Sequence, residues 1–120
     1  MKRLFGALLL VIFLTPINAY AHSTLVTSNP KSGAVLSKSP NSIALTFNEN
    51  LIKIAGNNVS RVSLTDSNNS VIKLGRTTIN KSRIMAKITS TLKSGNYKIR
   101  YRVVSSDGHP ISGTIEFRVK

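Results

Sequence analysis

The sequence predicts an all-β fold, an immunoglobulin-like β-sandwich or Greek-key barrel of about seven short strands. Apolar residues alternate with polar ones over much of the chain, which is typical of strands that bury one face. Turn-forming residues separate these stretches at intervals of roughly 8–12 residues. No stretch has apolar residues spaced as on one side of a helix, so the pattern does not predict helices in place of these strands.

The start of the 120-residue chain has the features of a secretory signal peptide. Lys2 and Arg3 are followed by an apolar run from Leu4 to Leu14, and Ala19-Tyr20-Ala21 fits the small-residue rule for cleavage. A membrane span needs roughly 20 apolar residues, and this run is shorter. We therefore expect a signal peptide over 1–21 and a single domain over 22–120.

Five segments show the strand alternation most clearly, and turn-forming residues lie between them. In chain order the segments are 43–47, 61–64, 84–88, 97–103 and 115–119, and the turns are 29–33, 56–58, 66–69, 94–96 and 107–108. Tyr97 stands just after a turn, at the head of a strand. Its hydroxyl could bond to the upstream backbone, as in a tyrosine corner, or its ring could simply pack.

Composition narrows the possible chemistry. The chain has no Cys, so it holds no disulfide, thiolate metal site or iron–sulfur cluster, although export is expected. It also lacks a Gly-x-Ser-x-Gly elbow and a phosphate-cradling loop, so the sequence predicts no enzyme. The net charge of +13 fits an anionic partner, but the basic residues are spread out and often alternate with apolar ones, so the sequence favours a solvated strand face. No nucleic-acid-binding motif accompanies them, and nucleic acid is not expected as a partner.

Cleavage after Ala21 would make His22 the first residue of the mature chain. A terminal His offers its α-amine and its ring Nδ1, which together close a six-membered chelate ring on a metal. Asp107 and His109 are two residues apart in a loop, and Gly108 permits the tight turn that would bring both side chains to one ion. Three nitrogens and one oxygen suit tetragonal copper(II), whereas zinc prefers a tetrahedron.

Ordinary explanations of these residues stay open at this point. A Ser-Asp-Gly-His loop is a common turn in which Asp caps backbone amides, and a terminal His can be incidental. Glu49 follows a predicted strand, where it could be an outer metal ligand, an acceptor that holds a ligand in place, or an exposed turn residue.

Three stretches, which together span essentially all of 22–120, resemble the CopC family of periplasmic copper-binding proteins. The first is Ala21-His22 with Ser28-Asn29-Pro30-x-x-Gly33-x-x-Leu36, and the second is Leu45-Thr46-Phe47-Asn48-Glu49. The third and most specific is Leu92-x-x-Gly95-x-Tyr97-x-Ile99-x-Tyr101-x-x-Val104-Ser105-x-Asp107-Gly108-His109, followed by Gly113-x-x-x-Phe117.

The resemblance implies a single copper(II) site formed by the amine and ring of His22, by Asp107 and by His109, with a less defined role for Glu49. It also implies copper resistance or homeostasis in the periplasm, beside a CopD-like inner-membrane permease. We expect a monomer without enzymatic activity. Some members carry a Met-rich segment for copper(I), but here Met85 is the single Met outside the expected leader, so we expect no copper(I) site.

Two other functions compete with a copper-binding role. A terminal His with a second His is also the copper brace of lytic polysaccharide monooxygenases, which share the immunoglobulin-like core. Asp107 would fill a position that those enzymes keep open for oxygen, and the chain has no Trp. A metal-free immunoglobulin-like module that binds a protein or an anionic surface fits the basic charge.

Overall fold

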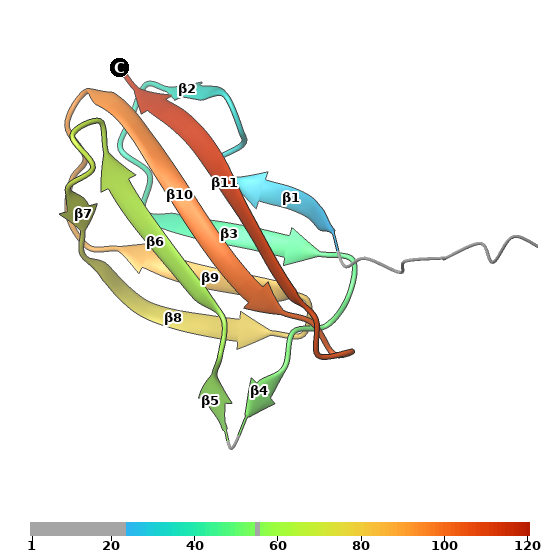
Figure 1. Ribbon diagram of the computed structural model, residues 1–120. Helices are drawn as coiled ribbons and strands as arrows, with labels where there is room; N and C mark the ends of the chain where they lie inside the picture. The colour runs from blue at the N-terminus through green and yellow to red at the C-terminus, as the bar shows by residue number, and fades with distance from the viewer. Residues whose placement is uncertain (1–23, 55) are drawn as a thin grey trace, which may run out of the picture.

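The computed structural model describes residues 24–54 and 56–120, which fold into two β-sheets packed face to face (Figure 1). The first sheet has the order β1 (Leu25–Asn29), β3 (Ser42–Phe47), β9 (Arg83–Ile88) and β8 (Leu74–Asn80). The second has the order β2 (Ala34–Leu36), β11 (Pro110–Val119), β10 (Gly95–Val104), β6 (Arg61–Asp66) and β7 (Val71–Ile72). A small hairpin pairs β4 (Lys53–Ile54) with β5 (Asn57–Asn58).

The all-β sandwich prediction is confirmed, although the two sheets hold nine strands where the alternation predicted about seven. The additional strands include β2 and β7, which have three and two residues and lie at the edges of the second sheet. Alternation needs about four residues to be recognised, so strands this short leave no signal in the sequence. Within the described ranges, no helix has the length and hydropathy that crossing a bilayer requires.

The core lies between the sheets and is filled by every second residue of the longer strands. On β9, for example, Ile84 and Ile88 are buried while Arg83 and Lys87 are exposed. Fully burying an aliphatic side chain contributes about 1.5–3 kcal/mol, so these inward rows account for much of the stability. The most deeply buried members are Ile43, Leu45, Leu64, Ile84, Ile99 and Val103.

Tyr97 forms the tyrosine corner that the sequence left open. Its hydroxyl donates a hydrogen bond to the carbonyl oxygen of Lys93 at 2.7 Å. Its ring also stacks on Phe117, with ring centroids 5.4 Å apart. Burial and the nearby charge of Asp66 raise the pKa of the phenol, so the hydroxyl keeps its proton and remains a donor.

The long β10–β11 hairpin carries the loop that holds Asp107 and His109. The two strands pair over their full ten-residue length, from Gly95 opposite Val119 to Val104 opposite Pro110. Tyr101 lies across Gly113, where a Cβ atom would overlap the tyrosine ring, and it meets Phe47 edge-on at 5.6 Å. This packing anchors the hairpin to the first sheet and fixes where its loop emerges.

Candidate metal site

The loop between β10 and β11 brings Asp107 and His109 together at one end of the sandwich. Asp107 Oδ2 lies 3.0 Å from His109 Nδ1. Gly108 has a φ of +87°, a backbone conformation that side-chain-bearing residues rarely adopt, and its N–H donates to the carbonyl of Ser105 at 2.8 Å. The turn therefore places both candidate side chains on the same side of the loop, as their spacing suggests.

Ser105 fixes the Asp107 carboxylate. The fully buried Ser105 donates its hydroxyl hydrogen to Asp107 Oδ1, and the backbone N–H of His109 donates to the same oxygen at 3.0 Å. These two bonds, with the ring of His109, lower the pKa of Asp107 from 3.8 to about 2. The carboxylate is thus ionised at any pH at which a metal would bind.

Sequence reasoning did not single out Ser105. A serine two residues before an aspartate looks like any turn residue, and its burial depends on the tertiary structure. Ser105 forms an isolated β-bridge with Leu51, a residue more than fifty positions away. A sequence pattern carries no signal for such a pairing.

His109 presents one ring nitrogen to Asp107 and the other to solvent. Its side chain is 81% exposed. An ionised carboxylate accepts hydrogen bonds and cannot donate them. Nδ1 of His109, which faces Asp107, therefore carries the ring proton in the neutral imidazole, and Nε2 keeps its lone pair. A carboxylate that orients an imidazole in this way is common around metal-binding histidines.

The segment 48–51 connects this loop to the N-terminal end of the described chain. Thr24 N–H donates to Asn48 Oδ1 at 2.7 Å, and Asn48 N–H donates to the carbonyl of Thr24 at 3.0 Å. Two residues further on, the carbonyl of Asn50 accepts from Ser106 N–H at 2.9 Å. The start of β1, the end of β3 and the β10–β11 loop therefore meet at one end of the sandwich (Figure 1).

Glu49 lies between the two hydrogen-bonded residues of this segment and is half-buried. His22 lies outside the described residues, two positions before Thr24. No group of three or more His, Cys, Asp or Glu side chains able to hold a metal occurs within residues 24–54 and 56–120. Among these residues, Asp107 and His109 thus make a pair.

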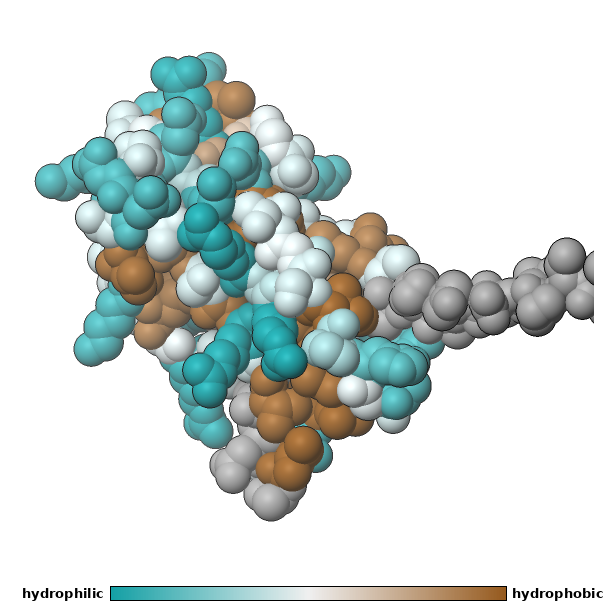
Figure 2. All heavy atoms as spheres, viewed as in Figure 1, coloured by the Kyte–Doolittle hydropathy of each residue, from teal (hydrophilic) through white to brown (hydrophobic). Residues whose placement is uncertain are grey.

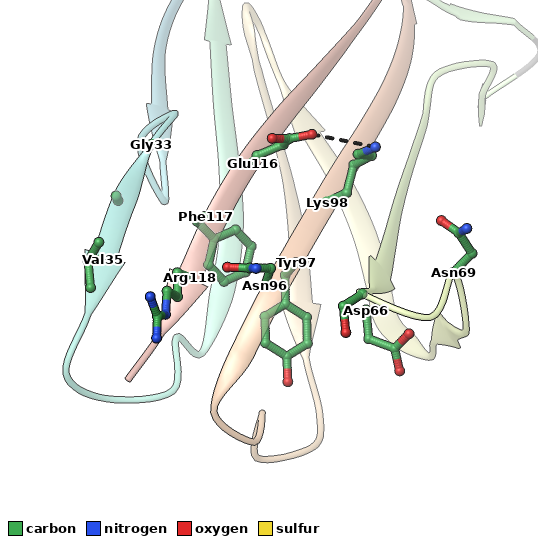
Figure 3. Close-up of a pocket in the computed structure, with 12 residues that line it drawn as sticks. Gly33, Val35, Asp66, Asn69, Asn96, Tyr97, Lys98, Glu116, Phe117 and Arg118 are labelled. Carbon is green, nitrogen blue, oxygen red and sulfur yellow. Dashed lines mark ion pairs between the residues drawn. The ribbon is translucent and has the colours of Figure 1, made fainter.

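A hollow in the described surface lies at the opposite end of β10 and β11, away from this pair. It has a volume of about 500 Å³, and Tyr97, Phe117 and the ion pair of Lys98 with Glu116 lie in its lining (Figure 3). The ion pair has an N–O distance of 3.4 Å and sits at the surface, with Glu116 70% exposed. The hollow has no histidine in its lining and adds nothing to the candidate metal site.

Comparison with known proteins places this chain in a family. The CopC domain model matches residues 25–120. Copper resistance protein C of Xanthomonas campestris pv. juglandis is 32% identical over 112 residues, covering 89% of this chain and 87% of that protein. The crystal structure of CopC from Methylosinus trichosporium OB3b superposes with a TM-score of 0.70 at 28% identity, covering 82% of this chain and 94% of that one.

A third relative is much longer than this chain. The copper transport protein CutJ of Bacillus subtilis is 31% identical over 127 residues, which cover 99% of this chain but only 22% of that protein. The three matches therefore cover the same domain, which makes up most of the first two relatives and a small part of CutJ.

Proteins of this family bind copper and are not enzymes, so neither a monooxygenase nor a metal-free module describes this chain. The match runs through β1 to β11 and includes the loop with Asp107 and His109. This chain belongs to the CopC family of copper-binding, copper resistance proteins.

Proposed function

We propose that the protein is exported to the periplasm and holds one copper(II) ion between its mature N-terminus and the β10–β11 loop. The ligands in this proposal are the α-amine and ring Nδ1 of His22, the carboxylate of Asp107 and the ring of His109. The supporting observation is the pair of hydrogen-bonded links from Thr24 to Asn48 and from Asn50 to Ser106. Two residues extend at most about 7 Å, so a terminus anchored at Thr24 stays close to this end of the sandwich.

The donor set fits copper(II). A carboxylate and three nitrogens suit a tetragonal site, and copper(II) heads the divalent affinity order. Met85, 37% exposed on β9, is the single Met of the described chain, and one thioether does not make a copper(I) site. Glu49, half-buried beside the Asn48 tether, is proposed to hold a ligand in place or to bind from outside the copper plane.

Binding requires His109 to turn. The two ring nitrogens of imidazole point in diverging directions, and Nδ1 faces Asp107 in the described structure. For Asp107 and His109 to reach one ion, the exposed ring has to rotate and exchange its hydrogen bond to Asp107 for a bond to copper. Ser105 keeps the carboxylate in place while this happens.

The role proposed for the bound ion is copper resistance or homeostasis, with handover to a CopD-like permease in the inner membrane. The name of the Bacillus subtilis relative, a copper transport protein within which this domain forms 22% of the length, supports a connection to transport. The protein then acts as a carrier or buffer, which captures copper(II) through ligands that have lost their protons.

The test compares a protein that begins at His22 with one that carries an additional Ala before it. The additional Ala moves the free amine away from the His22 ring and so blocks the chelate. This should weaken copper(II) binding at least ~10-fold, which is the smallest loss expected when a metal site is disturbed. Affinity is measured by competitive titration, and electron paramagnetic resonance counts the coordinating nitrogens. Equal affinity for the two proteins would contradict the proposed site.

His109→Ala serves as the second arm of the same experiment. This change should remove one nitrogen from the resonance pattern while leaving the amine and ring of His22 in place. An unchanged nitrogen pattern would assign His109 to the turn alone and exclude it from the copper ligands.

A further inference from the structure

The outer face of the second sheet carries a cluster of cations that the copper site does not use. β6, β10 and β11 are neighbours in this sheet, and their outward side chains form one continuous surface. We define the basic face by its cationic residues, which are Arg61, Lys98, Arg100, Arg102 and Arg118. Figure 2 shows hydrophilic side chains running across the front of the molecule, where Figure 1 places these three strands.

Strand register brings three arginines of this face together. Arg61 on β6 lies directly opposite Arg102 on β10, and Arg100 lies two residues along from Arg102 on the same face. All three are exposed, and a shallow hollow of about 530 Å³ lies among them, with Ser63 and Ser112 in its lining. Guanidinium groups and hydroxyls are the donors that bind phosphate oxygens.

These arginine charges are not balanced within the domain. The single acidic residue of the face, Glu116, pairs with Lys98 at 3.4 Å (Figure 3). Within the described ranges, no carboxylate oxygen comes within 4.0 Å of the cationic groups of Arg61, Arg100 or Arg102. Like charges directly opposite each other on neighbouring strands destabilise a sheet. An anionic surface that covers the arginines would relieve this repulsion.

The chemistry of the face fits a lipid surface better than a protein. Interfaces between proteins have an apolar, charge-depleted centre with a polar rim. Here the centre is the charged part, because every outward side chain from Asn96 to Arg102 on β10 and from Ser112 to Arg118 on β11 is polar or charged. Two exposed apolar side chains, Val35 and Val71, lie on the edge strands of this face. The broad array of cations between them matches the phosphate layer of an anionic bilayer, which attracts basic groups without requiring insertion.

We infer that the basic face docks the protein on the surface of an anionic phospholipid membrane. β10 and β11 would then lie along the bilayer, and the loop that carries Asp107 and His109 would project from their end beside the membrane. This inference does not depend on copper and would hold if the proposed ligands proved wrong.

The test uses the exported, metal-free protein and vesicles of phosphatidylcholine with or without about one third phosphatidylglycerol, with binding measured by co-sedimentation. We expect binding to the anionic vesicles alone, and progressive release as salt is raised. The triple change Arg61→Gln, Arg100→Gln and Arg102→Gln should weaken binding by at least ~10-fold, since each charge near the surface contributes about fivefold.

The matched control removes three cations from the other sheet. Arg76→Gln, Arg83→Gln and Lys87→Gln lower the net charge equally but lie on β8 and β9, and should change binding by less than about threefold, as expected when the charges are held away from the surface. Equal losses for the two triple variants would show that net charge alone acts, and would overturn the docking face. Tighter binding to a soluble acidic peptide than to vesicles would overturn it in favour of a protein partner.

Orientation gives an independent readout, because the chain has no Cys of its own. A polarity-sensitive dye is attached to Ser112→Cys on the basic face or to Thr78→Cys on the outside of the first sheet, both exposed positions. The inference requires that anionic vesicles shift the emission at position 112 and leave position 78 unchanged. Similar shifts at both positions would contradict it.

Discussion

At the scale of single residues, the unusual acidity of Asp107 predicts a specific pH dependence. The hydroxyl of Ser105 and the N–H of His109 stabilise its charged form and lower its pKa from 3.8 to about 2. A pKa lowered by folding contributes stability that is fully present above the unfolded value and is lost as pH falls through the folded value. We therefore expect the loop interactions of Asp107 to stabilise the metal-free protein above pH 3.8 and to fade towards pH 2.

Asp107→Asn tests this expectation by chemical unfolding across that pH range. The free energy of unfolding of the unaltered protein should fall towards that of the variant between pH 3.8 and about 2, and the two should run parallel above this range. A difference that stays constant down to the lowest pH would show that the Asp107 charge is not stabilised in the native loop.

At the scale of elements, the segment 48–51 joins parts of the chain that are distant in sequence. Asn48 holds Thr24 through a bond of its side chain and a bond of its backbone, whereas Asn50 holds Ser106 through its backbone carbonyl. Asn48→Ala removes the side-chain bond to Thr24 and should loosen the start of β1, which lies two residues from the proposed ligand His22.

We expect Asn48→Ala to lower the copper(II) affinity by about 10-fold, which is the smallest loss expected when a group that orients a metal ligand is removed. Asn50→Ala is the matched control, since the carbonyl that accepts from Ser106 survives the substitution. Competitive titration of both variants measures the difference. Unchanged affinity in Asn48→Ala would mean that this tether does not position the N-terminus for copper.

At the scale of the whole molecule, copper should stabilise the entire sandwich. The proposed ligands come from both ends of the chain, so unfolding separates them and leaves only weaker partial sites such as the His22 chelate. Free copper at a hundredfold excess over its dissociation constant then adds at most about 2.7 kcal/mol. For a domain of this size, each kcal/mol raises the melting temperature by about 4–8 °C.

Calorimetry with and without copper(II) measures this rise, and a chelator should reverse it. The rise should shrink as pH falls, because protonated ligands release the metal. The protein with an Ala added before His22 provides the control, with a smaller rise at the same copper concentration. Full stabilisation of that control would place the ion elsewhere.

Much of the fold could be predicted from local sequence. Alternation at 43–47, 84–88 and 115–119 reports which face of each strand is buried, because side chains on a strand point to opposite sides in turn. The edge strands β2 and β7 escaped prediction because they are too short for a period to appear. The tyrosine corner was one of two possibilities until the 2.7 Å bond to Lys93 decided between them.

The sequence by itself determined the all-β class and the CopC resemblance, and it supplied His22, Asp107 and His109 as the candidate ligands. These depend on residue identity, short spacing and two-residue alternation. The tertiary structure alone decided that buried Ser105 holds Asp107, that Asn48 ties down the chain at Thr24, and that the arginines of three strands share one face. Ser105 is only two residues from Asp107, but its burial depends on the tertiary structure. The other two features join residues that are distant in sequence, and no local pattern in a single sequence records which distant partner a strand or a hydrogen bond will find.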